Sequence, residues 1–188
     1  MNFSEILNNR RSIRSYQDKK VPPEVINSII NDSILAPSSG NEQPWKFIII
    51  NNRNVIKRIA AESKNNILER IASNPGDAAK KYEKMLQNDS FDIYYNAPTV
   101  ILILGDASLK HTNINCALAA SYLMMSATSK GLGTCWVAFG TEVYDPQLIE
   151  ELGIPENHKI IAPIAIGYPT KIPDILHRND PLIIKVIN

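Results

Sequence analysis

Residues 96–104, NAPTVILIL, decide the fold of this chain. The first three form a turn, and every residue from Thr99 to Leu104 is β-branched or aliphatic. A continuous apolar run of this length predicts a strand with both faces buried, because a strand with one face in water alternates apolar and polar residues. We therefore expect this segment to lie in the core.

The flanking sequence predicts one α+β domain over residues 1–188. Apolar residues recur at helical spacing from Val25 to Ile34, behind Pro22-Pro23, and Pro37 ends this helix. The segment 64–92 is charged, sparsely apolar and broken by Asn74-Pro75-Gly76, so we expect a peripheral helical excursion or lid there. The other expected elements are helices at 3–9, 54–63, 112–130 and 145–152, and strands at 45–50, 134–139, 159–166 and 182–186.

Composition argues against several classes of protein. Hydrophobic residues make up 44% and charged residues 21% of the 188, and the net charge is +1, so no global field favours nucleic acid, a membrane or an acidic partner. Cys116 and Cys135 are too few for a disulfide framework, and the N-terminus lacks the apolar segment of a signal peptide. Both observations indicate a cytoplasmic protein with reduced thiols. The uncharged run 111–129 is too polar to span a membrane.

Arg10, Arg11 and Arg14, together with Ser12, form the densest basic cluster in the chain. Guanidinium groups bind oxyanions through a planar two-pronged fork, so this cluster suits a phosphate. The alternative is a basic turn that only faces water.

Other kinds of catalytic site find little support. The sequence has no GxSxG, and the three histidines lack metal-ligand spacing, so we expect neither a serine nucleophile nor a metal site. Cys135 lies within an apolar strand and is expected to be structural. Gly131, Gly133 and Gly140 form neither GxGxxG nor a Walker A loop, which disfavours a nicotinamide dinucleotide held in a Rossmann domain.

Five motifs, in this order, resemble those of the nitroreductase family of FMN-dependent oxidoreductases: RRSIRSY, APSSGNEQPWKF, NAPTVILIL, GLGTCWVAF and AIGYP, followed by a late arginine. The resemblance runs over nearly the whole chain. It implies an α+β, nitroreductase-like fold with a central mixed sheet flanked by helices. It also implies an intertwined homodimer with two FMN molecules at the interface, each contacted by both subunits.

The resemblance assigns roles to individual positions. Arg10 and Ser12, with Arg11 beside them, correspond to the residues that hold the FMN phosphate, and Arg14 to a basic residue near the ribityl chain and pyrimidine edge. A late residue, Arg178, completes the phosphate site, with His177 as a weaker candidate. The loop that the partner subunit lays beside the flavin corresponds to Pro37, Ser38, Ser39 and Asn41, with Gln43 at a polar edge and with Pro44 and Trp45 fixing the loop against the core.

The resemblance also places a strand beside flavin N5 and the dimethylbenzene ring. This strand contains Cys135, Trp136, Val137, Ala138 and Phe139. Many relatives have glycine where this chain has Ala138; the backbone N–H survives that change, while the added methyl narrows the substrate face. Segment 64–92 corresponds to the substrate lid.

The implied activity is a ping-pong cycle. NADH or NADPH delivers hydride to flavin N5, and a nitroaromatic, quinone or similar electron-poor acceptor then takes its place. No side-chain acid or base is required, because the cofactor carries the chemistry. The alternatives are the same flavin fold with a specialised reaction (reductive dehalogenation, flavin fragmentation or a biosynthetic oxidase step), a non-catalytic flavin-binding or redox-sensing protein, and an α+β protein without flavin.

Overall fold

The central sheet is built around the strand that the apolar run predicts. The structure, a computed structural model, describes residues 1–187. Strand β2 (Thr99–Asp106) lies inside a four-stranded sheet of order β1-β2-β4-β3, in which β4 is His158–Gly167. The edge strands are β1 (Trp45–Ile50) and β3 (Gly133–Trp136).

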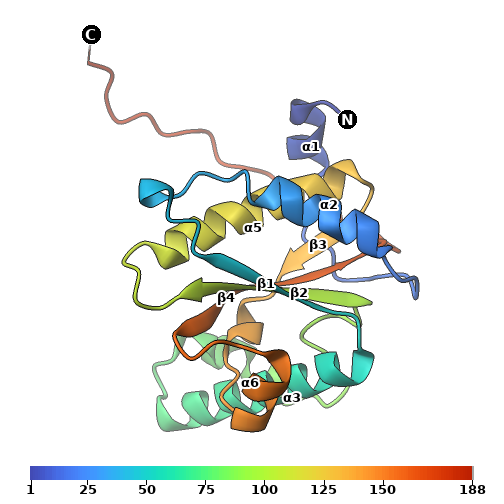
Figure 1. Cartoon of the computed structure of the whole chain (residues 1–188), viewed down its shortest axis with the longest axis vertical. Helices are drawn as coiled ribbons and strands as arrows, with labels where there is room; N and C mark the ends of the chain where they lie inside the picture. The colour runs from blue at the N-terminus through green and yellow to red at the C-terminus, as the bar shows by residue number, and fades with distance from the viewer. Residues whose placement is uncertain (188) are drawn as a thin grey trace.

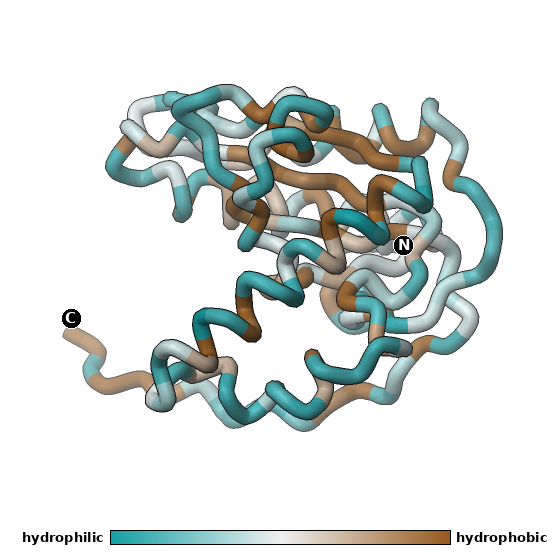
Figure 2. Tube along the Cα trace, turned by 90° about the horizontal axis from the view of Figure 1, so that it is seen from below, coloured by the Kyte–Doolittle hydropathy of each residue, from teal (hydrophilic) through white to brown (hydrophobic). Residues whose placement is uncertain are grey.

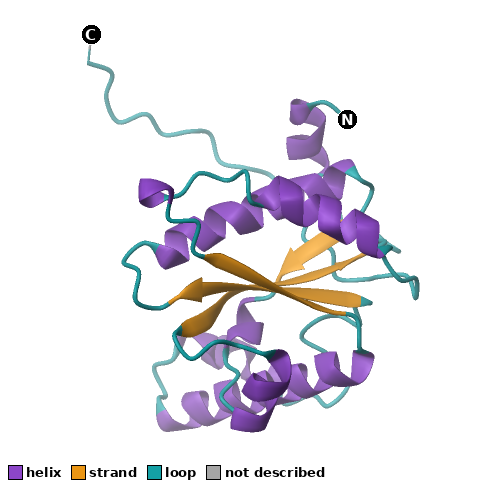
Figure 3. Cartoon of the chain, in the orientation of Figure 1, coloured by secondary structure: helices purple, strands orange, loops and turns teal. Residues whose placement is uncertain are grey.

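Helices cover both faces of this sheet (Figure 3). One face carries α2 (Pro23–Ser33) and α5 (Thr112–Ser129), with α1 (Phe3–Asn9) beyond them, and the other carries α3 (Arg53–Ser73) and α6 (Pro146–Leu152) (Figure 1). The α+β class and the flanking helices are therefore confirmed.

The side chains of β2 alternate between two cores. Ile101 and Ile103 pack with the α2 and α5 side, while Val100, Leu102 and Leu104 pack with the α3 side. All five are at most 1% exposed. Successive side chains of a strand point to opposite faces, so a strand between two helical layers must be apolar throughout. Each such side chain contributes about 1.5–3 kcal/mol through burial.

The expectation of a mixed sheet is wrong. All three strand pairings are antiparallel. A mixed sheet requires a parallel neighbour, and within residues 1–187 the parallel pairing is a single bridge between Ser12 and Thr134.

Segment 64–92 is helical, but part of it belongs to the core. Helix α3 continues to Ser73, well past the expected end at residue 63, and the short helices η2 (Ala78–Tyr82) and α4 (Glu83–Leu86) follow. Ile67, Ile71 and Leu86 are at most 1% exposed, so a purely peripheral excursion is ruled out for these residues. Ile67 and Ile71 continue the helical spacing of the buried face of α3, although few other apolar residues accompany them.

The expected strand 134–139 ends early. Strand β3 stops at Trp136, and the backbone turns at Val137 into the short helix η3 (Ala138–Thr141). The N–H of Gly140 donates to the carbonyl of Val137 at 2.9 Å and closes this turn. Ala138 is therefore the first residue of a turn rather than part of a strand.

The C-terminal tail does not form the expected strand at 182–186. Its apolar side chains at Leu182, Ile183, Ile184 and Val186 are 70–93% exposed. The tail runs away from the body of the chain (Figure 1), and Figure 2 shows that it is hydrophobic along much of its length. A strand requires a hydrogen-bonded neighbour, and among residues 1–187 none lies beside this segment.

The helices that the structure describes include none that is both long enough and apolar enough to cross a membrane.

Candidate functional site

The basic cluster lies on an extended segment beside the edge strand β3. Helix α1 ends at Asn9, and Ser12 then bridges to Thr134. The N–H of Ile13 donates to the carbonyl of Thr134 at 2.9 Å, and the N–H of Gln17 donates to that of Tyr168 at 2.8 Å. These bonds fix the cluster between β3 and the chain that leaves β4, which is the start of the C-terminal tail.

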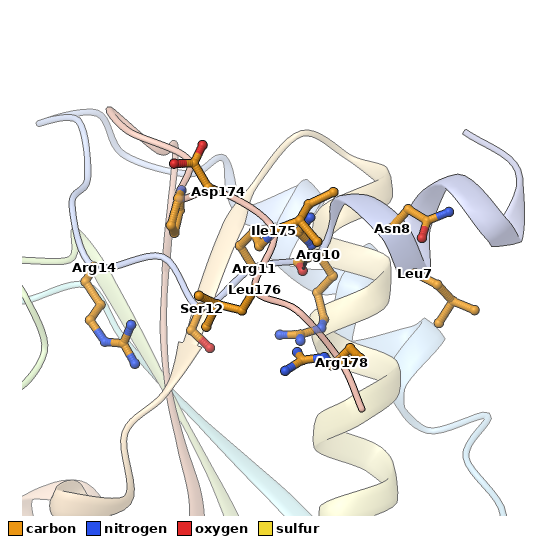
Figure 4. A pocket seen from close by; sticks show the side chains of 11 residues that line it. Leu7, Asn8, Arg10, Arg11, Ser12, Arg14, Asp174, Ile175, Leu176 and Arg178 are labelled. Atoms are coloured by element: carbon orange, nitrogen blue, oxygen red, sulfur yellow. Dashed lines mark hydrogen bonds between the residues drawn. The ribbon is translucent and has the colours of Figure 1, made fainter. Parts of the chain in front are cut away.

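This arrangement forms an open cavity of about 450 Å³. In Figure 4 the side chains of Arg10 and Arg178 lie close together, and Ser12 lies between them and Arg14. The structure thus brings together five of the residues singled out in the sequence, and His177 does not line the cavity. The lining residues are Leu7, Asn8, Arg10, Arg11, Ser12, Arg14, Pro173, Asp174, Ile175, Leu176 and Arg178.

The cavity carries excess positive charge. Four of its lining residues are arginines and one, Asp174, is an acid. Among residues 1–187, no salt bridge involves any of these four arginines. Arg11 donates from Nη1 to the carbonyl of Arg10 at 2.6 Å, whereas its Nε is buried and has no hydrogen-bond partner in the part of the chain that the structure describes. A buried donor without an acceptor costs free energy, so the cavity suits an oxyanion such as a phosphate.

Arg14 is held apart from the other arginines by Tyr95. Its Nε donates to the Tyr95 hydroxyl at 3.3 Å, and its guanidinium carbon lies 5.8 Å from the ring centroid. The hydrogen bond with Tyr95 raises the pKa of Arg14 above its ordinary value, so this residue is a fixed cation. Sequence reasoning missed Tyr95, because the contact joins positions far apart in the chain.

Tyr95 has an unusual backbone conformation. Its φ is 58° and that of Asn96 is 54°, a region that bulky residues seldom adopt. Asp92 stabilises this turn, since its carboxylate accepts the N–H of Tyr94 at 2.8 Å and that of Asn96 at 3.2 Å. Asp92, two residues before Tyr94, and Asn96, directly after Tyr95, are the signal that sequence reasoning could have used to predict the turn.

The end of β3 lies next to the cluster. Cys135 and Val137 are buried, Trp136 is half-buried and Ala138 is exposed. Burial raises the pKa of the Cys135 thiol, although the positive charges of Arg14 and Arg10 oppose this shift. A protonated, buried thiol is a packing group, as the sequence predicts.

The loop expected to lie beside the partner subunit's flavin is remote from the cavity of its own chain. Residues 37–43 carry the short helix η1 (Ser39–Asn41), and the N–H of Ser39 donates to Oδ1 of Asn115 in the first turn of α5 at 3.1 Å. Pro44 and Trp45, expected to fix this loop, are buried. None of Pro37, Ser38, Ser39, Asn41 and Gln43 lines the cavity.

The loop and the cluster lie at opposite ends of α5. Thr128, in the last turn of α5, lines a smaller pocket together with Arg11. A helix rises about 1.5 Å per residue, which puts Asn115 roughly 20 Å from Thr128. The loop has positive φ at Gly40, Asn41 and Gln43 (57°, 55° and 45°), so its backbone is strongly turned.

Known proteins resemble this chain over most of its length. The sequence profile of the nitroreductase family matches residues 7–168. The "Putative NADH dehydrogenase/NAD(P)H nitroreductase" of Archaeoglobus fulgidus is 29% identical over 91% of this chain and 87% of that protein. Human iodotyrosine deiodinase 1 is also 29% identical, over 92% of this chain and 64% of that protein.

The fold agrees with these sequence matches. The crystal structure of a nitroreductase with bound FMN from Bacteroides fragilis superposes with a TM-score of 0.81, at 25% identity, over 100% of this chain and 99% of that one. The family profile alone spans well over half of the sequence. This chain belongs to the nitroreductase family.

Proposed function

We propose that this chain is an FMN-dependent oxidoreductase that passes hydride from NADH or NADPH to an electron-poor acceptor. The observation that carries the proposal is the cavity beside β3, which four arginines line together with Ser12; none of the four forms a salt bridge with another of the described residues 1–187. The FMN-containing nitroreductase of similar fold supports the choice of ligand. When bound, FMN supplies a ring nitrogen, N5, that accepts and returns the hydride.

The cavity fits the phosphate of FMN. Arg10 and Arg178 approach it from opposite parts of the chain, Ser12 adds a hydroxyl, and Arg11 brings a buried unpaired donor. Arg14 stands apart on the Tyr95 side and is proposed to face the ribityl chain and pyrimidine edge, where a cation offsets negative charge. Cys135, Trp136, Val137 and Ala138 are proposed to line the N5 side.

We propose a homodimer in which a second copy completes the site. The loop with Pro37, Ser38, Ser39, Asn41 and Gln43 cannot reach its own chain's cavity from the far end of α5, so its proposed contact with flavin is to the partner's site. The exposed apolar tail supports an interface, because hydrophobic surface of this kind is normally covered. Ile114, Leu118 and Tyr122 add exposed apolar surface on α5.

The proposed cycle is ping-pong, with donor and acceptor occupying the same space in turn. The protein orients them and excludes water, and no side-chain acid or base is needed. Nitroaromatics and quinones are the proposed acceptors, and the part of the expected lid that follows α3, residues 74–92, is proposed to select among them.

Steady-state assays test this function. Purified protein with bound FMN should oxidise NADH or NADPH rapidly when a quinone such as menadione is present, with parallel double-reciprocal plots. Inertness of the FMN-loaded protein towards both nucleotides and several quinones would contradict a reductase.

A second candidate is reductive dehalogenation, which the similarity to iodotyrosine deiodinase 1 favours. The discriminating assay supplies 3-iodo-L-tyrosine with chemically reduced, FMN-loaded protein and measures iodide. Iodide release at a rate that exceeds quinone reduction would favour the dehalogenase, and its absence beside rapid quinone turnover would favour the reductase.

A further inference from the structure

A row of polar side chains on α3 binds the segment that follows η3. Glu62, Asn66 and Arg70 are spaced four residues apart, which places them on one face of the helix. Oε1 of Glu62 accepts the N–H groups of Tyr144 at 3.3 Å and Asp145 at 3.1 Å. The amide of Asn66 donates to the carbonyl of Glu142 at 2.9 Å. The row therefore fixes the backbone immediately after η3.

Arg70 adds the charged contacts of this row. Its Nη2 donates to Oε1 of Glu142 at 2.7 Å and its Nε to Oε2 at 3.2 Å, which is the two-pronged pairing that guanidinium geometry favours. Its Nη1 pairs with the carboxylate of Asp77. We call these contacts the Arg70 bridge. The Arg70 side chain is 43% exposed, while those of Glu142 and Asp77 are 16% and 9% exposed, so the bridge lies at the surface with its acidic ends partly shielded from water.

The two acids belong to segments that meet again through aromatic packing. Asp77 caps η2 by accepting the N–H of Ala79 at 2.7 Å. Tyr82, the last residue of η2, packs edge-to-face on Phe139 of η3 with ring centroids 5.4 Å apart. The bridge and this ring pair thus tie the beginning and the end of η2 to the η3 turn.

We infer that Arg70 is a positioning residue that fixes η3 relative to η2, and so sets the geometry of the acceptor side of the flavin site. The part of this inference that places η3 beside the flavin rests on the proposed function. The Arg70 bridge itself rests on contacts within this chain. Because α3 is anchored in the core through Ile67 and Ile71, Arg70 transmits a rigid position to both segments.

Hydrogen–deuterium exchange on the purified full chain tests the bridge without using activity. In Arg70→Gln, peptides covering 137–145 and 74–88 should exchange at least about five times faster than in the wild type, because both acids lose their partner. Arg58→Gln is the matched control: Arg58 lies on the same helix and pairs with Glu151 of α6, away from η2 and η3. That variant should leave both peptides unchanged.

A second measurement tests the effect on the site. Stopped-flow reduction of the FMN-loaded protein by its nicotinamide donor should slow about 10-fold in Arg70→Gln, while the Kd for FMN stays within about twofold, since the arginine cavity is untouched. Arg70→Lys keeps the charge but loses the fork, and should recover only part of the rate.

The outcomes separate the inference from the proposed function. Unchanged exchange in both peptides of Arg70→Gln would overturn the bridge, whatever the protein binds. Faster exchange with an unchanged reduction rate would overturn the positioning role. A wild-type chain that binds no FMN would defeat the proposed function and, with it, the positioning role, but would leave the bridge intact.

Discussion

The two ends of α5 carry the two halves of the predicted flavin site, and they are built differently. At the C-terminal end, the basic cluster, β3 and the start of the tail are tied together by backbone hydrogen bonds within one chain. At the N-terminal end, residues 37–43 form an exposed, strongly turned loop that contacts α5 through Asn115. The basic cluster lines a cavity, whereas none of Pro37, Ser38, Ser39, Asn41 and Gln43 in the loop lines it. This difference is why we propose that each end serves a different copy of the dimer.

The largest expected effect is on FMN affinity and comes from the basic cluster. Arg10→Ala should raise the Kd for FMN about 10- to 100-fold, because a charged hydrogen bond contributes about 1.5–3 kcal/mol. Fluorescence titration of FMN into flavin-free protein measures this change. Arg53→Ala is the control, since Arg53 pairs with Asp18 outside the cavity. Equal losses in both variants would show that general charge, not the cavity, binds FMN.

The next largest effect is expected where the segment that carries the basic cluster packs against β3. A Cβ added at Gly133 would lie 2.5 Å from Cγ1 of the buried Ile13, so Gly133→Ala must displace the segment that carries Ser12 and Arg14. We expect a loss of about 1–3 kcal/mol in the free energy of unfolding and weaker FMN binding. Denaturant unfolding measures the first quantity. The control is Gly76→Ala, where the nearest atom is 3.6 Å away, and equal stability of the two variants would contradict this packing.

A mixed dimer tests whether the two ends of α5 serve different copies. Gly40→Val should distort the loop, since Gly40 has φ of 57° and valine is strained there. Refolded together in equal amounts, Arg10→Ala and Gly40→Val chains should recover about a quarter of wild-type activity, because half of the dimers are mixed and each contains one undamaged site. Recovery of no activity beyond that of the separate variants would place both ends in the same site.

The smallest effect concerns the C-terminal end of α5, where Asp32 of α2 binds Lys130 at 2.7 Å and the Ser126 hydroxyl at 2.5 Å. These hydrogen bonds, that of Lys130 first, lower the pKa of Asp32 below its ordinary value. A lowered pKa in the folded state adds stability that is complete above the unfolded pKa of about 4 and is lost as the pH falls through the folded value.

Asp32→Asn should therefore be less stable than the wild type at neutral pH, by less than about 1 kcal/mol because the pair is partly exposed. The difference in Tm should vanish at pH values below the lowered pKa. A difference that stays constant across the acidic range would contradict the assignment to this carboxylate.

The sequence predicts what is local, namely apolar period and turn chemistry. The strand at 45–50 is confirmed as Trp45–Ile50, and the helix at 112–130 differs from Thr112–Ser129 by one residue. The full length of α3 escaped prediction, because Ile67, Leu68 and Ile71 lie in a segment that is otherwise mostly polar or charged. The tail was wrongly expected to be a strand, because an apolar run indicates burial or pairing without saying whether a partner is present.

The candidate site likewise has features that local sequence predicts and contacts that it does not. Clustered arginines and a phosphate-binding geometry follow from adjacent residues, and the fold brings Arg178 to them as expected. The contacts of Arg14 with Tyr95 and of Arg70 with Glu142 join positions that no spacing rule relates. Such contacts depend on how the layers pack, so a single sequence does not reveal them.

The visible absorption spectrum of freshly purified protein, with chromatographic identification of any flavin released on denaturation, tests whether this chain binds FMN. We expect one FMN per chain in the wild type and little or none in Arg10→Ala. A colourless wild-type protein that fails to take up added FMN would contradict this expectation, and would return the cluster of Arg10, Arg11 and Arg14 to a basic turn that faces water.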